Sequence, residues 1–525
     1  MGSKLFINGK IWKPDSTFDE SFGVISNRFS FTGSNPAAEK LRHEYDEITD
    51  LKGKTVLPGL FDSHIHFVYG SLLKKQLDCR QIASFNELRK LIDYQIEKRK
   101  DSDEWIIGAN LNINMLNLES IISNPLDTIN SDVPIYISNY DYHSALANTI
   151  ALKKSGLSDR LSQFSEDEIP RLKNDEPTGI IKERAMQYVF DNLPEVSVEN
   201  KAGAVYDFIK IMHSYGITSV CDITLPDNLE VYKYLSNAGK LNIRVNSYLP
   251  ITENKNIDDY LASVKNIDDE FFKIKGFKIF YDGSLGSQSG YFKENYLNQN
   301  HNGIKTEIAK SGKLPELFRM LDGKGWQLIT HAIGDKAVDE TLSLYEELVK
   351  INGYKDRRAR IEHAQHIDEN DFPRFKKSNI IISAQPVHLK YDAGLVQKTL
   401  PVQLVNRTHN YGKLINSGIK ICFGTDFPIV EINPFENIQE AITRETNPGV
   451  FTPENKIDLN NCIKCYTTNG AYASFNDELG LIEKGMKADF VVLDKDIFSI
   501  PEKEIQTIKA EETYINGEKV FSIYD

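Results

Sequence analysis

Cysteine is scarce in this chain of 525 residues, which contains only five. A small, odd number of cysteines excludes a disulfide framework and is typical of proteins from a reducing compartment. Cys462 and Cys465 form a lone C-x-x-C motif within a helical sequence pattern. No second cysteine pair follows, so two buried helix residues are a better interpretation than a zinc or redox site.

Long apolar runs are also absent, and no stretch approaches the ~20 residues that a membrane-spanning helix needs. The N-terminus MGSKLFINGKIW has no cleavable signal and lacks the hydroxyl residue of a myristoylation site at its sixth position. The formal net charge of −13 argues against a nucleic-acid or anionic-membrane partner. We therefore expect a soluble, cytoplasmic protein.

Both ends of the chain are β-rich. Residues 1–55 contain KLFINGKIW, which alternates and turns at Asn8-Gly9. Residues 478–525 contain ETYINGEKVF, which turns in the same way at Asn516-Gly517. Two similar ends around a long middle predict one small β-sandwich domain built from both termini.

Between these ends, short apolar runs alternate with amphipathic stretches such as KAVDETLSLYEELVKI, the pattern of βαβ units. Eight strand candidates match the number that a closed (β/α)₈ TIM-like barrel needs. We therefore assign residues 56–477 to an α/β barrel domain. The candidates are 55–66, 217–223, 243–249, 276–283, 326–334, 359–365, 380–386 and 419–426.

The gap between the first and second strand candidates is far too long for a βα loop. It contains the helical stretch SFNELRKLIDYQIEKRK and the strand-like PIYISNY. We interpret residues 75–200 as a subdomain inserted after the first barrel strand, and we expect it to cover the barrel mouth.

Histidines and one aspartate recur where the predicted barrel strands end. His64 and His66 end the first strand as H-x-H, His331 the fifth, His363 the sixth and Asp426 the eighth. Alternate residues of a strand share a face, so both imidazoles of the H-x-H pair can point at one ion. A single H-x-H is more often structural, but four of the chain's 11 histidines at the functional ends of barrel strands predict a metal site.

Several motifs then point to a known family. LPGLFDSHIH resembles the first-strand signature of the amidohydrolase superfamily. KIFYDGSLGSQSG, THAIGDKAVD, RIEHAQHI, SAQPVH and FGTDFPI, in this order, resemble its YtcJ-like branch, which includes N-substituted formamide deformylases. ELGLIEKGMKADFVVLD is similar to the superfamily's C-terminal β segment, so the resemblance spans nearly the whole chain.

The resemblance implies a role for each matching residue. His64, His66 and Asp426 would bind the more buried metal ion, and His331 and His363 would bind a second one. Zn²⁺ is the default, as one or two ions, although another divalent transition metal such as Mn²⁺ or Fe²⁺ also suits imidazole ligands.

Lys278 occupies the strand position where many superfamily members carry a carboxylated lysine that bridges two metal ions. We favour such an N-carboxylated lysine, since a buried ammonium among cations would be costly. The alternatives are a salt bridge within the barrel mouth and, with it, a mononuclear site.

The implied activity is hydrolysis of a non-peptide carbon–nitrogen bond of the amide type in a small molecule. The metal would activate a water molecule, and Asp426 would act as the general base. A non-hydrolytic enzyme on the same barrel, such as an isomerase or decarboxylase, and a catalytically silent binding protein are the alternatives. Family members are often oligomeric, which makes a homodimer a further expectation.

Substrate contacts are harder to predict. Each candidate also has a purely structural interpretation, such as a surface-loop histidine, a helix start, a tight turn in DGSLGS or an ion pair. His366 lies in a loop after His363 and is left out of the metal set. The substrate-binding candidates are His143, Glu183, Asp282, His388, Asp392 and Arg444.

Overall fold

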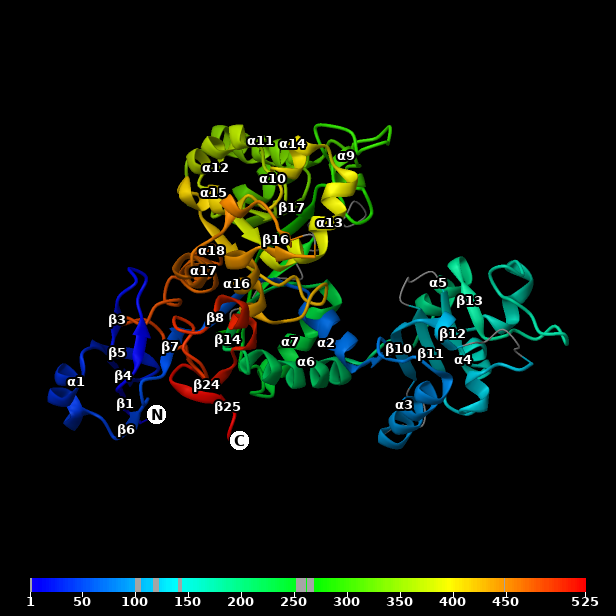
Figure 1. Cartoon of the computed structure of the whole chain (residues 1–525), viewed down its shortest axis with the longest axis horizontal. Helices are drawn as coiled ribbons and strands as arrows, with labels where there is room; N and C mark the ends of the chain where they lie inside the picture. The colour runs from blue at the N-terminus through cyan, green and yellow to red at the C-terminus, as the bar shows by residue number, and fades with distance from the viewer. Residues whose placement is uncertain are drawn as a thin grey trace. The chain divides into compact units, whose positions relative to one another are not determined.

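The computed structural model describes residues 2–99, 105–116, 122–139, 144–251, 261, 269–447 and 449–525 (Figure 1). The chain divides into two compact units. One unit combines Met1–Tyr69 with Val205–Asp525, and the other is Gly70–Ala204. None of the described helices is both long and apolar enough to cross a membrane.

The first unit contains a barrel of eight parallel strands in chain order, which confirms the predicted α/β barrel. The sheet closes where β8 meets the segment after β20: the Asp426 N–H donates to the His64 carbonyl oxygen at 2.7 Å, and the His66 N–H donates to that of Phe427 at 2.8 Å. The strands are β8 (Leu60–Ile65), β14 (Ile217–Ile223), β15 (Arg244–Pro250), β16 (Phe272–Phe280), β17 (Gln327–Ala332), β18 (Arg360–His363), β19 (Ile381–Ala384) and β20 (Ile421–Phe423).

The first predicted strand, 55–66, is two strands in the structure. β7 (Thr55–Pro58) pairs with strands of the terminal β domain, and only β8 enters the barrel. Gly59 lies between them, where an added Cβ would come 2.2 Å from Thr218 Oγ1 of β14. A larger residue at this position would therefore disturb the step from one sheet to the other.

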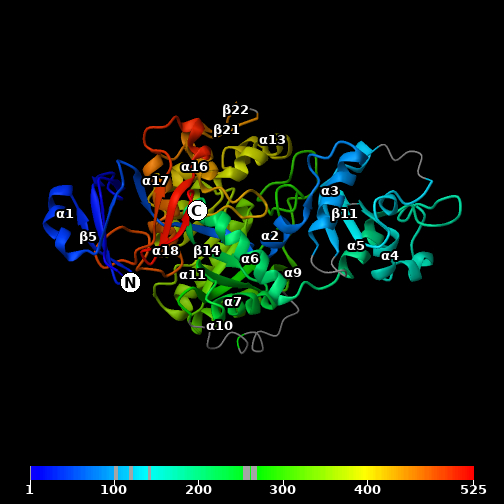
Figure 2. The ribbon, with the colours of Figure 1, turned by 90° about the horizontal axis from the view of Figure 1, so that it is seen from below.

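Helices surround the barrel (Figure 2). α11 shows why these segments are helical: its buried residues Ala337, Val338, Thr341, Leu342 and Tyr345 recur at three- and four-residue spacing and form one apolar face. The principal helices are α6 (Val198–His213), α7 (Leu229–Asn237), α10 (Leu314–Gly323), α11 (Asp335–Asn352), α12 (Phe372–Ser378), α13 (Leu389–Thr399), α15 (Tyr411–Asn416), α16 (Pro434–Thr443), α17 (Leu459–Tyr466) and α18 (Thr468–Ala473). Cys462 and Cys465 are buried on α17 and form no disulfide, and burial raises the pKa of both thiols.

Both chain ends build a β-sandwich, as predicted. One sheet has the order β5-β4-β1-β6 and the other β25-β24-β23-β7-β2-β3. Phe6 and Phe22 stack at 4.7 Å between ring centroids and meet Phe490 and Tyr514 of the second sheet. The strands are β1 (Lys4–Ile7), β2 (Lys10–Trp12), β3 (Phe18–Asp19), β4 (Ser21–Ile25), β5 (Arg28–Gly33), β6 (Glu47–Asp50), β23 (Phe490–Leu493), β24 (Ala510–Ile515) and β25 (Glu518–Ser522).

The second unit is an insertion after the first barrel strand and has a sheet and a core of its own. Its sheet order is β13-β12-β11-β10-β9, with β9 (Leu77–Asp78), β10 (Ile106–Leu111), β11 (Ile135–Asn139), β12 (Ser144–Ala147) and β13 (Ile180–Lys182). Its main helices are α3 (Phe85–Lys98), α4 (Thr149–Lys154) and α5 (Glu183–Asp191). The predicted domain limits, and the prediction that this part covers the barrel mouth, stay predictions.

Replacing Gly276 by alanine is expected to destabilise the barrel by about 1–3 kcal/mol or more. Gly276 lies in β16, and a Cβ there would come 1.9 Å from the Gln327 carbonyl oxygen of β17, which cannot move without disturbing the sheet. Urea unfolding measures the change. Gly394→Ala in α13 is the matched control, because an added Cβ there meets no atom within 4 Å. Equal stability of both variants would contradict the steric argument.

Candidate metal centre

The predicted ligands lie together at the C-terminal ends of the barrel strands. His64 is on β8, with His66 just beyond it, and His331 and His363 are on β17 and β18. Asp426 follows β20 by three residues. Ring centroids are 5.8 Å apart for His64 and His66, 4.9 Å for His64 and His363, and 4.5 Å for His331 and His363. The structure therefore brings side chains from distant parts of the chain to one end of the barrel, where barrel enzymes place their chemistry.

Asp426 is the centre of this group. Its Oδ1 lies 3.5 Å from His64 Nε2 and 3.3 Å from His66 Nε2, and its Oδ2 lies 4.0 Å from His363 Nδ1. Burial acts to raise the pKa of Asp426, but the two H-x-H imidazoles outweigh it, and the pKa lies well below its usual range. The carboxylate is therefore ionised and available as a ligand.

The backbone is strained at two of these residues. His363 has a φ of 70° and Asp426 a φ of 61°. These values lie in the left-handed region, which residues other than glycine seldom adopt. Such conformations persist where the surrounding structure enforces them, commonly at functional sites. For Asp426 the restraint includes Asp62 on β8, which accepts hydrogen bonds from the Thr425 hydroxyl at 2.6 Å and the Thr425 N–H at 3.0 Å.

Three of the four imidazoles are oriented by a partner at one ring nitrogen, which leaves the other nitrogen as a lone-pair donor. Glu362 Oε2 lies 2.5 Å from His64 Nδ1, Gln385 Oε1 lies 2.9 Å from His363 Nδ1, and the Gly283 carbonyl oxygen lies 3.2 Å from His331 Nε2. Burial, followed by the charge of Lys278, lowers the pKa of His64 to about 4 and that of His331 to about 3. Neutral imidazoles of this kind are the form that binds metal ions.

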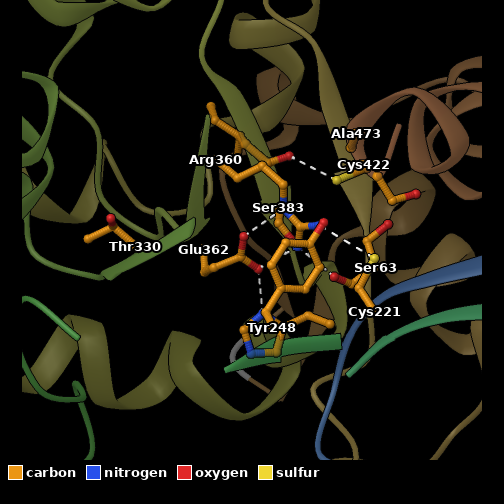
Figure 3. A network of polar contacts seen from close by, with 12 residues as sticks. Ser63, Cys221, Tyr248, Thr330, Arg360, Glu362, Ser383, Cys422 and Ala473 are labelled. Carbon is orange, nitrogen blue, oxygen red and sulfur yellow. Dashed lines mark hydrogen bonds and ion pairs between the residues drawn. The ribbon is translucent and has the colours of Figure 1, made fainter. Parts of the chain in front are cut away.

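The Glu362 carboxylate that contacts His64 forms a buried ion pair with Arg360 (Figure 3). Arg360 Nε and Nη2 each donate to Glu362 at 2.8 Å, and Arg360 Nη2 also donates to the Ser63 carbonyl oxygen at 2.6 Å. Both side chains are fully buried. Burial acts to raise the pKa of Glu362, but Arg360 and His64 outweigh it and hold the pKa well below its usual range. The pair thus keeps an anion against His64 Nδ1 and fixes the direction of its Nε2.

The donor set fits a divalent metal ion. His64, His66 and Asp426 place ligand atoms within 4.8 Å of one another, and so do His363, His388 and Asp426. Within the described part of the chain, the buried atoms Asp426 Oδ1 and His388 Nε2 have no hydrogen-bond partner, which is unusual for buried polar atoms. Imidazole nitrogen and carboxylate oxygen are suitable ligands for zinc and related ions. His388, predicted to line the substrate pocket, meets the same distance criterion as His64, His66, His363 and Asp426, whereas the predicted ligand His331 belongs to neither group.

Lys278 lies on β16 at the same end of the barrel and is fully buried. Its ammonium nitrogen has no hydrogen-bond partner among the residues that the structure describes. Burial lowers its pKa to about 8, although Glu362 and Asp426 act in the opposite direction. The salt bridge that was the alternative interpretation of Lys278 is not recorded in the described structure.

Asp282 lies beside the histidine cluster, with Oδ1 3.5 Å from His331 Nε2. It accepts three backbone hydrogen bonds, from Ile333 at 3.0 Å, Gly334 at 2.9 Å and Tyr291 at 2.8 Å. These bonds join the loop after β16 to the loop after β17, so Asp282 also holds His331 in place.

The remaining substrate candidates are more widely placed. The Arg444 guanidinium donates to the carbonyl oxygens of His409 and Phe451, so the protein itself satisfies it. Asp392 accepts from Gln365 at 3.1 Å and lies 3.8 Å from His409 Nε2. Glu183 begins α5 in the second unit, and His143 lies outside the described residues. Their substrate roles stay predictions.

Sequence reasoning missed three residues that orient the cluster: Arg360, Glu362 and Gln385. A signal for two of them was present, because Arg360 and Glu362 are oppositely charged residues two apart on a strand of otherwise apolar character. Alternate strand residues share a face, so this pair already pointed to a buried ion pair inside the barrel. His366, left out of the metal set, donates through Nδ1 to the Ile333 carbonyl oxygen at 3.3 Å.

Comparison with known families agrees with this geometry. Residues 47–521 match the amidohydrolase family. The chain belongs to this family. As an amidohydrolase with clustered metal ligands, it is a metal-dependent hydrolase on a barrel scaffold.

Three relatives of this amidohydrolase align over almost their whole length. Protein LONG AFTER FAR-RED 3 of Arabidopsis thaliana is 31% identical, with 98% of this chain and 91% of the relative aligned. Putative amidohydrolase YtcJ of Bacillus subtilis is 26% identical, with 95% and 94% aligned. An N-substituted formamide deformylase of Arthrobacter pascens is 24% identical, with 94% and 93% aligned. The predicted resemblance to the YtcJ-like branch is confirmed.

A solved structure extends the similarity to three dimensions. An uncharacterized metal-dependent hydrolase from Pyrococcus furiosus superposes with a TM-score of 0.79 at 25% identity, and the alignment covers 94% of this amidohydrolase and 99% of the other chain. This amidohydrolase therefore shares its fold, over nearly the whole chain, with a metal-dependent hydrolase.

Proposed function

We propose that this amidohydrolase cleaves a carbon–nitrogen bond of the amide type, other than a peptide bond in a protein, in a small molecule. The observation that carries the proposal is the convergence of four imidazoles, three of them oriented by hydrogen-bond partners, and an ionised Asp426 at the barrel mouth. The relative named as an N-substituted formamide deformylase supports this bond type. The overall change is addition of water across the bond, which yields a carboxylic acid and an amine.

His64, His66 and Asp426 would hold one ion, and His331 and His363, with His388 as a further donor, would hold a second. When bound, a divalent ion such as Zn²⁺ supplies a water molecule acidic enough to deprotonate near neutral pH and a positive charge for the carbonyl oxygen. Glu362 and Gln385 keep the imidazoles turned so that their free nitrogens face this position.

Asp426 would act as the general base. Its Oδ1 is buried and has no hydrogen-bond donor among the described residues, so it is available to accept a proton from the attacking water. The same carboxyl then delivers that proton to the leaving nitrogen, since a free amine leaves more easily than its anion. The proton that Asp426 takes from water is thus the proton that it gives to the amine, and no second acid–base group is needed.

Lys278 would be N-carboxylated. Its Nζ is buried without a partner, and a pKa lowered to about 8 raises the fraction of the neutral amine, the form that reacts with carbon dioxide. The product is an anion, which removes the cost of a buried ammonium next to metal ions. Protein equilibrated with ¹³C-labelled bicarbonate should show a carbamate carbon resonance that is absent from Lys278→Met. A spectrum without this resonance in the metal-loaded wild type would contradict carboxylation.

A substrate screen tests the activity. Metal-loaded protein is incubated with N-formyl amines, N-acyl amines, lactams and ureas, and release of the amine is measured. The His331→Asn variant should lose turnover on any true substrate, because it removes a nitrogen donor that faces the cluster. Turnover by His331→Asn equal to that of the wild type would assign the activity to another site.

Removal of the metal by a chelator is expected to abolish turnover and to lower the free energy of unfolding. A ligand present at 100 to 1,000 times its Kd stabilises a folded protein by about 2.7–4.1 kcal/mol. Thermal unfolding before and after chelation, and after addition of Zn²⁺, measures this contribution. Chelated protein that keeps full activity and an unchanged Tm would show that the histidine cluster needs no ion.

A further inference from the structure

A second cavity lies at the opposite end of the barrel from the histidines. It has a volume of about 370 Å³ and opens to solvent between α12, α15, α17 and α18. Ile380 and Ile421, at the N-terminal ends of β19 and β20, form part of its wall, whereas the metal ligands follow the C-terminal ends of the barrel strands. This cavity is therefore separate from the candidate metal centre. Its size is in the range of small-molecule sites.

Three lysines from three different segments line this cavity: Lys376 of α12, Lys420 before β20 and Lys464 of α17. A Cβ added at Gly418 would lie 3.7 Å from Lys376 Nζ, which places that ammonium against the turn between α15 and β20. Lys420 Nζ lies 4.4 Å from the centre of the Tyr472 ring. Lys420 and Lys464 are both half-buried.

Acidic side chains are absent from the described wall of this cavity. No carboxylate within 4.0 Å of any of the three ammonium groups is recorded among the described residues, although the whole chain has 75 acidic and 62 basic residues. Asp458, at the start of α17, binds the backbone N–H and the side-chain amide of Asn461. Burial, followed by the charge of Arg358, lowers the pKa of Lys420, as expected for an ammonium group without a counter-charge.

Helix ends explain part of this arrangement. Lys376 and Lys464 lie in the last turns of α12 and α17, where a cation interacts favourably with the helix dipole. That interaction accounts for a lysine on each helix separately. It does not account for the presence of both in the wall of one cavity together with Lys420, which lies between α15 and β20.

We propose that this cavity binds a small organic phosphate. Three lysines in one wall, with no acidic side chain among the described lining residues, supply positive charge for a phosphate group, and charge-assisted hydrogen bonds to its acceptor oxygens are the strong ones. Ile415, which is half-buried, and the edges of the more deeply buried Phe375, Ile380 and Ile419 line the same cavity and offer apolar contacts for the organic part, which a free inorganic anion does not need. The site is independent of the proposed hydrolytic activity.

Calorimetric titration at constant ionic strength tests the proposal, with inorganic phosphate and phenyl phosphate as probes. Wild-type protein should bind both, and phenyl phosphate more tightly, because its ring can contact the apolar wall. A Lys376→Met, Lys420→Met, Lys464→Met variant should bind about 100-fold more weakly, because three charged contacts are lost. Methionine is similar in length to lysine, so the substitutions remove the charges and leave the cavity lined. If the triple variant does not fold, the single variant Lys420→Met is titrated in its place and should also bind more weakly than the wild type.

The matched control is Lys40→Met, Lys52→Met, Lys484→Met, which removes the same charge from exposed positions outside the cavity. Binding by this control should equal that of the wild type. Wild-type protein that binds neither probe, or equal weakening in both triple variants, would overturn the proposal. Unchanged binding in the cavity variant would do so too, since the phosphate would then bind elsewhere, for example at the metal centre.

Discussion

Replacing Asp426 by asparagine is expected to lower kcat by about 10²–10⁴-fold, the usual contribution of a positioned acid–base group. The amide has the same shape but cannot take up a proton. It also removes the negative charge that lies 3.5 Å and 3.3 Å from His64 Nε2 and His66 Nε2. The measurement is turnover of a substrate from the screen at saturating metal, with metal content determined on the same sample.

Metal content separates the two roles of Asp426. A variant that retains its metal and loses turnover supports the general base, whereas loss of both would show that metal binding is its main role. Asp496→Asn is the matched control, because Asp496 binds Lys10 and Thr55 in the β-sandwich and should leave kcat unchanged. Asp426→Asn with metal bound and kcat within about threefold of the wild type would contradict a general base at this position.

Replacing Glu362 by leucine is expected to cost about 3–5 kcal/mol of unfolding free energy, because it leaves the fully buried Arg360 without its partner. It is also expected to weaken metal binding by about 10–100-fold, since His64 Nδ1 loses the carboxylate that orients the ring. Urea unfolding of chelated protein gives the first quantity, and competition with a chelator of known affinity gives the second.

The double variant Arg360→Met, Glu362→Leu separates these effects. Removing both members of a buried ion pair is often nearly neutral, so most of the lost stability should return. Metal binding should stay weak, because the acceptor for His64 Nδ1 is still missing. If both variants bind metal as tightly as the wild type, Glu362 serves only as the partner of Arg360.

The number of barrel strands is confirmed, and seven of the eight lie where apolar runs bounded by turns predicted them, whereas only the second half of the first predicted strand belongs to the barrel. The error in the first strand is instructive. Thr55–Pro58 and Leu60–Ile65 are both fully buried, so their apolar pattern is continuous across Gly59 although they belong to different sheets. The hydrophobic pattern of a segment indicates that it is buried, but it does not indicate which strand it pairs with.

The ligand positions were predictable for a geometric reason. In a parallel barrel every strand ends at the same rim, so His64, His331, His363 and Asp426 had to meet there once each was assigned to a strand end. The role of His388 was not predictable in this way. It lies in a short 3₁₀ helix after β19, and its approach to His363 and Asp426 depends on the path of that loop.

Periodicity and strand ends along the chain were enough to predict the barrel, the shared terminal sandwich and which side chains meet at the candidate metal centre, since these depend on local pattern and on the common direction of the strands. Only the tertiary structure shows which partners orient those residues. Glu362 meets His64, and Lys376 meets the turn before Lys420, across gaps in the chain that no local pattern spans. Contacts of this kind depend on side-chain packing between separate elements, which is defined only when the whole barrel has closed.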